Sequence, residues 1–555
     1  MSKLDQIADL FQKGSALHQQ NNFVEAQAIY EKILCIQPDH FDVLQLLGSL
    51  LAQIKKHSEA IKYLSKALKI NPNDARTQCN QGIVLKELKR FDEALSSYNQ
   101  AIAIEPKFAQ AYYNRGIVLQ ELKRCDEALD SYDQAISINS NFVNAYNNKG
   151  VILKSLKRFD EALSVYNQAI SIKPDYSKTY YNQGIALQEL NRHDEALISY
   201  DQAIAINPDY PEAYNNVGNT LQELKQFDKA LVNYNYAINI DPNYADAFFN
   251  KSTLLILRGD YSEGWQLYEW RWKQKHNINS RRHYKKPLWL GNESLIDKTL
   301  LITIEQGFGD YIQFIRYALL VQKLDVKVIL EVPSILISVV ATLKGQFTLV
   351  ETGKPLPDFD YHCPVASLPL AFKTTLKSIP GELPYLYANE NCKKKWGKKL
   401  GKKTITRIGL VWAGNPDHTN DYNRSLLLKQ FSSLLTLPFE FHSLQKDLRE
   451  VDAQTLIDFP DLYQHQDELH DFSDTAALID AMDIIISVDT SVAHLAGAMG
   501  KKLWLLLPYL PDFRWMLDRE DSPWYPCAIL YRQKKINDWD SALEKLKADL
   551  LKLTN

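Results

Sequence analysis

The sequence predicts an α-helical solenoid followed by two α/β halves, each built on a parallel sheet. Three observations predict it. Prolines recur every 34 residues through the first half, glycines recur ten residues after them, and from Thr299 short apolar strands alternate with helices. At 555 residues the chain is also too long for a single domain.

The repeats are visible as three columns in one phase. The prolines are Pro38, Pro72, Pro106, Pro174, Pro208 and Pro242, with Ser140 in the one vacant slot. The glycines are Gly48, Gly82, Gly116, Gly150, Gly184 and Gly218, with Ser252 in the next slot, and the alanines are Ala26, Ala60, Ala94, Ala128, Ala162, Ala196 and Ala230. Small residues suit the close crossing of two helices, and proline stops the second helix. We therefore expect about seven helical hairpins, stacked as a right-handed superhelix over residues 1–272.

Residues 261–272, YSEGWQLYEWRW, read as a truncated eighth unit with three tryptophans. We expect this aromatic segment to cap the solenoid and to dock it onto the part that follows. The whole pattern resembles the tetratricopeptide repeat, and this resemblance implies a protein or peptide partner bound by the repeats.

An asparagine stands two residues before five of the helix glycines and before Ser252. In the repeat family the first helix of each hairpin lines the concave surface, where an amide can both donate to and accept from a peptide backbone. The column resembles the asparagine ladder of the O-linked N-acetylglucosamine transferases. The alternative is that each amide only bonds the neighbouring repeat. The column consists of Asn80, Asn114, Asn148, Asn182, Asn216 and Asn250.

Two basic segments divide the second half of the chain. Residues 273–298 and 393–406 are expected to be linkers, and the run 393–407 holds eight Lys or Arg and no acid. Between the two segments lies an N-terminal α/β half at 299–392, with a helix expected from about 311 to 323. After the second segment comes a C-terminal half at 407–555, which ends in an amphipathic helix at 539–553. Two such halves form a cleft, and parallel sheets bind ligands at the carboxyl ends of their strands.

Composition narrows the class of protein. The net charge of −3 gives no field that would attract nucleic acid, and no apolar run is long enough to span a bilayer. The six cysteines form no C-x-x-C pair, and the N-terminus lacks the apolar core of a signal peptide. We expect a cytoplasmic protein with reduced cysteines.

The segment SVDTSVAHLAGAMG, residues 487–500, interrupts a buried strand with a polar turn. Asp489, Thr490 and Ser491 form the turn, and a helix of small residues is expected to follow from Val492 to Met499. A helix N-terminus that points into the cleft is an anion site, to which the two hydroxyls and His494 can add donors. The alternative is a simple cap with a packed histidine.

Residues 482–508 resemble the diphosphate-binding segment of the family 9, heptosyltransferase-like glycosyltransferases. Further matches are EQGFGDYIQFIRY, AGNPDHTNDYNRS, HSLQKD, DFSDTAAL and DFRWMLDREDSPWYP, in the expected order over most of 299–535. The resemblance implies the GT-B fold, with two Rossmann-like halves. It also implies a nucleotide-sugar substrate and no cofactor. One departure is Ser491, where that family often has glycine.

The resemblance assigns the acceptor base to Asp310 in the GD loop, where Gly307 and Gly309 permit close backbone approach. The alternative is a capping box, in which Asp310 is the N-cap and Gln313 the third helical residue. Arg424 and Lys446 are candidate diphosphate contacts. A guanidinium such as that of Arg424 can form two parallel hydrogen bonds to a phosphate. Either of these two cations can instead be a surface charge.

Other polar and aromatic residues carry less weight. Asn415 and Asn420 are further polar candidates near Arg424, and packing is the favoured role for Trp504, Trp515 and Trp524. No metal is expected, because the D-x-D motif at 358–360 precedes a strand of the N-terminal half.

The sequence thus predicts a metal-independent inverting glycosyltransferase that acts on a protein or peptide recruited by its repeats. One alternative is a non-catalytic scaffold with a degenerate transferase domain. Another is an enzyme with a glycan acceptor, which the repeats only localise.

Overall fold

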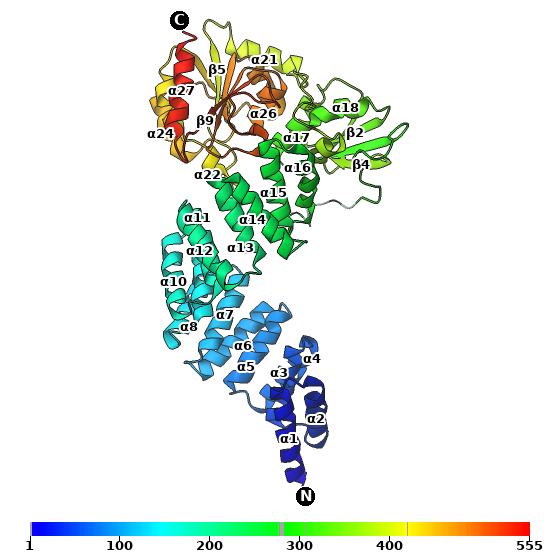
Figure 1. The fold of residues 1–555 in the computed structure, drawn as a ribbon, viewed down its shortest axis with the longest axis vertical. Coiled ribbons are helices and arrows are strands. Elements are labelled where there is room, and N and C mark those ends of the chain that lie inside the picture. The colour runs from blue at the N-terminus through cyan, green and yellow to red at the C-terminus, as the bar shows by residue number, and fades with distance from the viewer. Residues whose placement is uncertain are drawn as a thin grey trace. The chain divides into compact units, whose positions relative to one another are not determined.

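The computed structural model describes residues 3–275, 277, 282, 284–305, 307–418 and 420–554. It divides into two compact units, residues 1–220 and residues 221–555, and each unit is described by itself. Figure 1 shows the helical repeats and the two parallel sheets.

The predicted hairpins are present at the predicted period. In the first unit they are formed by α1 (Lys3–Gln19), α2 (Phe23–Ile36), α3 (Phe41–Gln53), α4 (His57–Ile70), α5 (Ala75–Glu87), α6 (Phe91–Ile104), α7 (Ala109–Glu121), α8 (Cys125–Ile138), α9 (Val143–Ser155), α10 (Phe159–Ile172), α11 (Ser177–Glu189) and α12 (His193–Ile206). Helix α13 (Pro211–Glu223) runs across the boundary. In the second unit follow α14 (Phe227–Ile240), α15 (Ala245–Arg258), α16 (Tyr261–Tyr268) and the short 3-10 helix η1 (Glu269–Lys273). The truncated eighth hairpin is therefore α15 and α16.

The glycine column exists because a tyrosine of the paired helix fills the space that a side chain would need. A Cβ added at Gly82 or at Gly116 would lie 2.6 Å from the Cε1 atom of Tyr98 or Tyr132, respectively. Both tyrosines are fully buried. These two hairpins thus close around a glycine–tyrosine contact, whereas Gly48 meets Leu64 in the same place. The apolar surface of each hairpin is completed by the next hairpin.

The N-terminal α/β half has a four-stranded parallel sheet in the order β3-β2-β1-β4. Its strands are β1 (Thr299–Thr303), β2 (Lys327–Val332), β3 (Phe347–Glu351) and β4 (Tyr361–Pro364), with η3 (Ser334–Leu336), α19 (Ile337–Val340), η4 (Val365–Ser367) and α20 (Leu368–Ala371) in the connections. The helix expected at about 311–323 is divided into α17 (Phe308–Phe314), η2 (Ile315–Tyr317) and α18 (Ala318–Gln322).

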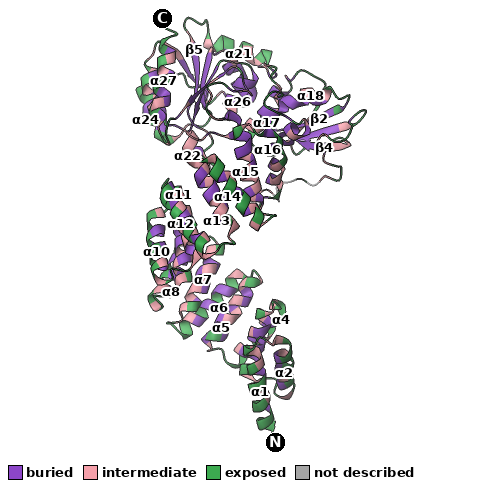
Figure 2. Cartoon of the chain, in the orientation of Figure 1, coloured by how far each residue is buried: buried purple, intermediate pink, exposed green. Residues whose placement is uncertain are grey.

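The C-terminal half has a five-stranded parallel sheet in the order β6-β5-β7-β8-β9. Its strands are β5 (Arg407–Val411), β6 (Glu440–Ser443), β7 (Ile484–Val488), β8 (Leu503–Leu507) and β9 (Ala528–Arg532). The other elements are α22 (Asp421–Arg424), η5 (Leu428–Phe431), α23 (Ser432–Leu435), η6 (Glu450–Asp452), α24 (Ala453–Asp458), α25 (Phe472–Asp480), α26 (Ser491–Ala498), η7 (Phe513–Trp515) and the terminal helix α27 (Trp539–Leu551). Every residue of β5, β7 and β8 is buried, and the strand labelled β5 is drawn in purple in Figure 2. Burial on both faces explains why these strands are continuous apolar runs.

Both segments expected as linkers carry ordered structure. Helix α21 (Glu390–Leu400) occupies much of 393–406, because Trp396 is buried and donates to Asp474 of α25 at 3.2 Å. Lysines of this run pair with acids of the C-terminal half, among them Lys395 with Asp474 at 3.0 Å. In the first segment, residues 276, 278–281 and 283 lie outside the described part. Trp289, at its end, pairs with the edge of β4 through the carbonyl of His362 at 2.9 Å.

An aromatic cluster docks the last hairpin onto both α/β halves. Trp265 of α16 packs edge-to-face on Phe314 of the N-terminal half and on Phe513 and Trp524 of the C-terminal half, with ring centroids 6.0, 6.1 and 6.5 Å away. The Trp524 indole donates to the hydroxyl of Tyr261 at 3.1 Å. Trp504, Trp515 and Trp524 are all buried, so they pack as expected.

Candidate functional site

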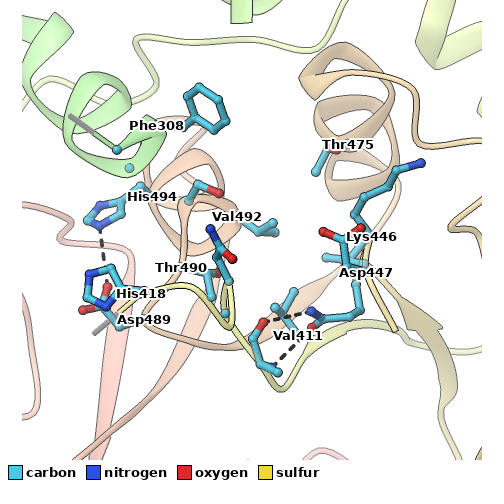
Figure 3. A pocket seen from close by; sticks show the side chains of 18 of the residues that line it. Phe308, Val411, His418, Lys446, Asp447, Thr475, Asp489, Thr490, Val492 and His494 are labelled. Carbon is cyan, nitrogen blue, oxygen red and sulfur yellow. Dashed lines mark hydrogen bonds and ion pairs between the residues drawn. The ribbon is translucent and has the colours of Figure 1, made fainter. Parts of the chain in front are cut away.

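A cavity of about 820 Å³ lies in the second unit, between the two α/β halves. Nine of the residues that the sequence nominated line it: Gly307, Gly309, Asp310, Arg424, Lys446, Asp489, Thr490, Ser491 and His494. Asn415 and Asn420 line it too. Figure 3 shows Phe308 and His494 on one side of the cavity, opposite Lys446, Asp447 and Thr475.

The cavity is centred on the switch point of the C-terminal sheet. Strands β5 and β7 are neighbours in the sheet. The chain continues from β5 to β6 on one side of this pair and from β7 to β8 on the other side, so the loops at their carboxyl ends diverge and leave a crevice. Arg424, from the segment after β5, crosses this crevice and donates to the backbone carbonyl of Asp489, after β7, at 3.0 Å. Its guanidinium lies directly over Gly414, where an added Cβ would be 2.7 Å from Nη2.

Helix α26 begins at Ser491, one residue earlier than the sequence predicts, and its first turn faces the cavity. Thr490 is its N-cap, and the Oγ1 atom accepts from the N–H of Ala493 at 3.5 Å. The alternative of a simple helix cap is therefore correct for the Thr490 hydroxyl. The first N–H groups of a helix have no acceptor within it, and Ser491 and Val492 line the cavity. Their amides therefore lie on the axis of the helix dipole and at the cavity wall, and the binding of an anion there stays a prediction.

His494 is only 4% exposed, so the alternative of a packed histidine describes most of its ring. Nδ1 lies 3.0 Å from the Tyr525 hydroxyl, and Nε2 lies 3.6 Å from a carboxylate oxygen of Asp489, drawn as a dashed line in Figure 3. The ring also stacks on Trp515 at 5.4 Å. Burial alone would raise the pKa of Asp489, but His494 and Arg424 outweigh it and hold that pKa below its usual value.

The GD loop enters the cavity from the N-terminal half, after β1. Helix α17 begins at Phe308 with Gly307 at the N-cap position, so Asp310 is the third helical residue. The capping-box alternative for Asp310 is therefore wrong, because it requires a helix that begins at residue 311, and the helix begins three residues earlier. Gly309 touches His494, and a Cβ there would lie 2.7 Å from Cδ2. The carboxylate of Asp310 forms an ion pair with Arg514.

Lys446 is exposed and donates to the carbonyl of Gln466 at 2.8 Å, so its charge stands at the rim of the cavity. The neighbouring Gln445 instead fixes the β5 loop: its amide donates to the Ala413 carbonyl at 2.9 Å and accepts from the Ala413 N–H at 3.3 Å.

Several lining residues escaped prediction: Phe308, His418, Thr475, Asp512 and Arg514. Asp512 and Arg514 lie in the DFRWMLDREDSPWYP segment, which follows β8, and this position after a parallel strand was an available signal. Burial and the charge of Arg424 lower the pKa of His418. Burial and the charge of Asp489 raise the pKa of Asp512 to about 7.

The asparagine column joins successive repeats of the solenoid. The side-chain amide of each of five members donates to the preceding repeat: Asn80 to Ser49 at 3.0 Å, Asn114 to Cys79 at 3.5 Å, Asn148 to Tyr113 at 3.3 Å, Asn182 to Asn147 at 2.9 Å and Asn216 to Tyr181 at 3.3 Å. The alternative of a bond to the neighbouring repeat is thus present at these five positions. Asn250 holds the same position on α15. Contact with a peptide stays a prediction.

The described residues offer neither a membrane-spanning helix nor a cluster of metal ligands. No helix among them is both long and apolar enough to cross a membrane. Within the same ranges, no group of three or more His, Cys, Asp or Glu side chains is placed to hold a metal ion.

Models of the tetratricopeptide repeat match residues 17–78, 82–123, 107–175, 141–209 and 211–244. The chain therefore contains tetratricopeptide repeats, a solenoid class that offers extended binding surfaces to its partners. Protein FlbA of Caulobacter vibrioides is 22% identical over 329 residues, which cover 54% of this chain and 54% of that protein. The chain thus spans about half the length of this curated relative.

Solved structures of repeat proteins are also similar to the chain. YrrB, described as a TPR protein with an unusual peptide-binding site, is 25% identical with a TM-score of 0.30 and covers 34% of this chain and 97% of its own. A tetratricopeptide repeat protein from Parabacteroides merdae is 18% identical with a TM-score of 0.38 and covers 45% of this chain and 99% of its own.

Proposed function

We propose that the second unit is a metal-independent inverting glycosyltransferase of GT-B type, which transfers a sugar from a nucleoside diphosphate donor to a protein or peptide held by the repeats. One observation carries the proposal. A single cavity brings Asp310 of the N-terminal half together with the α26 N-terminus and Arg424 of the C-terminal half. Glycosyl transfer needs a base and groups that bind the negatively charged diphosphate. The carboxylate can act as the base, and the helix N-terminus and the arginine are two kinds of anion-binding group.

The donor diphosphate binds at the N-terminus of α26. The amides of Ser491 and Val492 face its oxygens, and Arg424 adds a guanidinium fork from across the switch point. The capped Thr490 orients the turn, and Lys446 supplies charge from the rim. As the bond from the anomeric carbon to phosphate breaks, these donors stabilise the negative charge on the leaving oxygen.

The acceptor approaches from the side of the N-terminal half. Asp310 takes the proton of the acceptor nucleophile as this attacks the anomeric carbon on the face opposite the diphosphate, which inverts that centre. The repeats hold the acceptor polypeptide, and their tether raises its effective concentration at the cavity.

A non-catalytic scaffold is the second candidate, and one observation favours it. The carboxylate of Asp310 is already paired with Arg514, so it is not a free base in this structure. In that case the cavity would bind a nucleotide without turnover.

The test is thermal stabilisation of the full chain by UDP, GDP, CDP, ADP and dTDP and by their sugars, followed by a turnover assay. A ligand that binds only the folded state raises the melting temperature, and the shift grows with the logarithm of the ligand concentration relative to Kd. We expect one nucleotide to stabilise the protein, Arg424→Ala to abolish the shift, and Asp310→Ala to keep binding but lose turnover. Arg519→Ala is the control, because this arginine pairs with Asp521 at 2.7 Å and does not line the cavity. Binding without turnover in the wild type would support the scaffold, and absence of any shift would refute the donor site.

A further inference from the structure

Arg514 has no role in the function proposed above, yet it connects the two halves at the cavity. Its backbone N–H and its Nη1 atom both donate to the Oδ1 atom of Asp512, at 3.1 and 2.6 Å. Its Nη2 atom pairs with Asp310. The guanidinium therefore bridges a carboxylate of the C-terminal half and the candidate base of the N-terminal half.

The surroundings of Arg514 hold the guanidinium in place but leave one of its N–H groups unbonded. The residue is 9% exposed, and its guanidinium lies over the ring of Phe513 at 4.4 Å. Its buried Nε atom has no hydrogen-bond partner among the described residues. The position of Phe513 is fixed in turn by Trp265 and Tyr268 of the last hairpin, with centroids 6.1 and 5.7 Å away.

The two arginines of the cavity differ in what holds them. Arg424 donates to a backbone carbonyl, which a ligand does not displace, and its ion pair at 3.8 Å is with Asp421, which does not line the cavity. Arg514 donates to Asp512 and forms an ion pair with Asp310, and both of these carboxylates line the cavity. A diphosphate carries more negative charge than a carboxylate and matches the same planar fork, so it competes for Arg514 directly.

We propose that Arg514 is a substrate-exchanged latch on Asp310: the guanidinium holds the carboxylate until the donor diphosphate binds, and then transfers to the diphosphate. This inference rests on the proposed function. An ion-paired carboxylate accepts a proton poorly, so Asp310 becomes a base only after the donor is bound. The acceptor proton then moves to Asp310, the new bond to the anomeric carbon forms, and the electron pair of the broken bond stays on the diphosphate, beside Arg514.

The latch makes Asp310 a competitor of the donor, and a double-mutant cycle measures that competition. Isothermal titration of the full chain would use whichever of UDP, GDP, CDP, ADP and dTDP binds the wild type most tightly. We expect Asp310→Asn to tighten binding about tenfold, because one charge-assisted hydrogen bond no longer opposes it. Arg514→Gln should weaken binding about tenfold, and adding Asp310→Asn to it should change nothing further.

Two controls separate the latch from simpler causes. Asp447→Asn removes an exposed cavity carboxylate and measures general charge repulsion, which should account for less than twofold. Arg519→Gln should leave affinity unchanged. Arg514→Lys keeps the charge but not the fork, and its melting temperature shows whether the position tolerates change. We expect it to bind more weakly than the wild type and more tightly than Arg514→Gln.

The outcomes are distinct. If none of the five nucleotides binds the wild type, the proposed function fails and the latch fails with it. If a nucleotide binds but Asp310→Asn tightens it equally in the wild-type and Arg514→Gln backgrounds, the effect is charge repulsion and only the latch is overturned. Unchanged affinity in Arg514→Gln would overturn it as well.

Discussion

Arg271 of η1 forms a bidentate ion pair with Glu305, which follows β1, with N–O distances of 2.8 and 2.9 Å. The guanidinium also donates to Glu269 at 2.6 Å and to Ser367 at 2.7 Å. Arg271 is 1% exposed. The end of the helical repeats is therefore bonded, in a buried network, to the strand end from which the GD loop departs.

The first prediction concerns this pair. Arg271→Met removes the partner of a buried carboxylate, so we expect a loss of about 3–5 kcal/mol in the free energy of unfolding of the second unit. Urea denaturation followed by circular dichroism measures it. Arg258→Met is the control, since its partner Asp228 is 91% exposed. Glu305→Gln in the Arg271→Met background should recover part of the loss, and failure to recover any would contradict an uncompensated charge as the cause.

The second prediction concerns the aromatic cluster. Trp265→Ala leaves a cavity among three aromatic rings from both α/β halves, and we expect it to cost about 3–5 kcal/mol. Hydrogen exchange should accelerate in α16 and in the segment around Trp524 together. Tyr236→Ala on α14 removes a ring that is 52% exposed and should stay within about 0.5 kcal/mol of the wild type. Faster exchange confined to α16 would show that the cluster does not couple these parts.

The third prediction concerns the contact between the GD loop and helix α26. Gly309→Ala places a Cβ 2.7 Å from His494, so α17 and α26 must separate and the melting temperature should fall. Gly397→Ala is a matched control on α21, where an added Cβ meets no atom within 4 Å. There we expect a gain of about 0.5–1 kcal/mol from helix propensity. Equal melting temperatures for the two variants would contradict the close packing.

The fourth prediction concerns pH. His465 is buried against His442, with ring nitrogens 3.0 Å apart, and burial followed by the charge of His442 lowers the pKa of His465 to about 4. The unfolded chain, with a pKa of about 6.5, binds the proton first as pH falls. The stabilising contribution is therefore complete above about pH 6.5 and is lost progressively toward pH 4, up to about 3 kcal/mol.

Melting temperatures between pH 4.5 and 7.5 check this expectation. His465→Gln should flatten the pH dependence, while His470→Gln, which changes an exposed ring on the same loop, should leave it as in the wild type. The same slope in all three proteins would show that His465 does not titrate as described.

The repeats were predictable because their period is set by local contacts. Glycines of the column face a large side chain 16 residues later in the same hairpin, as Gly82 faces Tyr98 and Gly48 faces Leu64, so spacing alone reports the packing. The continuous apolar runs of β5, β7 and β8 likewise identify buried parallel strands. Helix α21 was missed because its exposed lysines dominate the pattern, while one buried tryptophan decides its position.

The sequence by itself determined the solenoid, the two parallel sheets and eleven of the residues that line the cavity, because strand ends and glycine turns have local signatures. Only the tertiary structure decided which charges are already engaged. It placed Arg514 beside Asp310, tied Arg424 to the carbonyl of Asp489, and used five asparagines to join neighbouring repeats. These pairings join residues between 31 and 204 positions apart, and no local pattern records such distances.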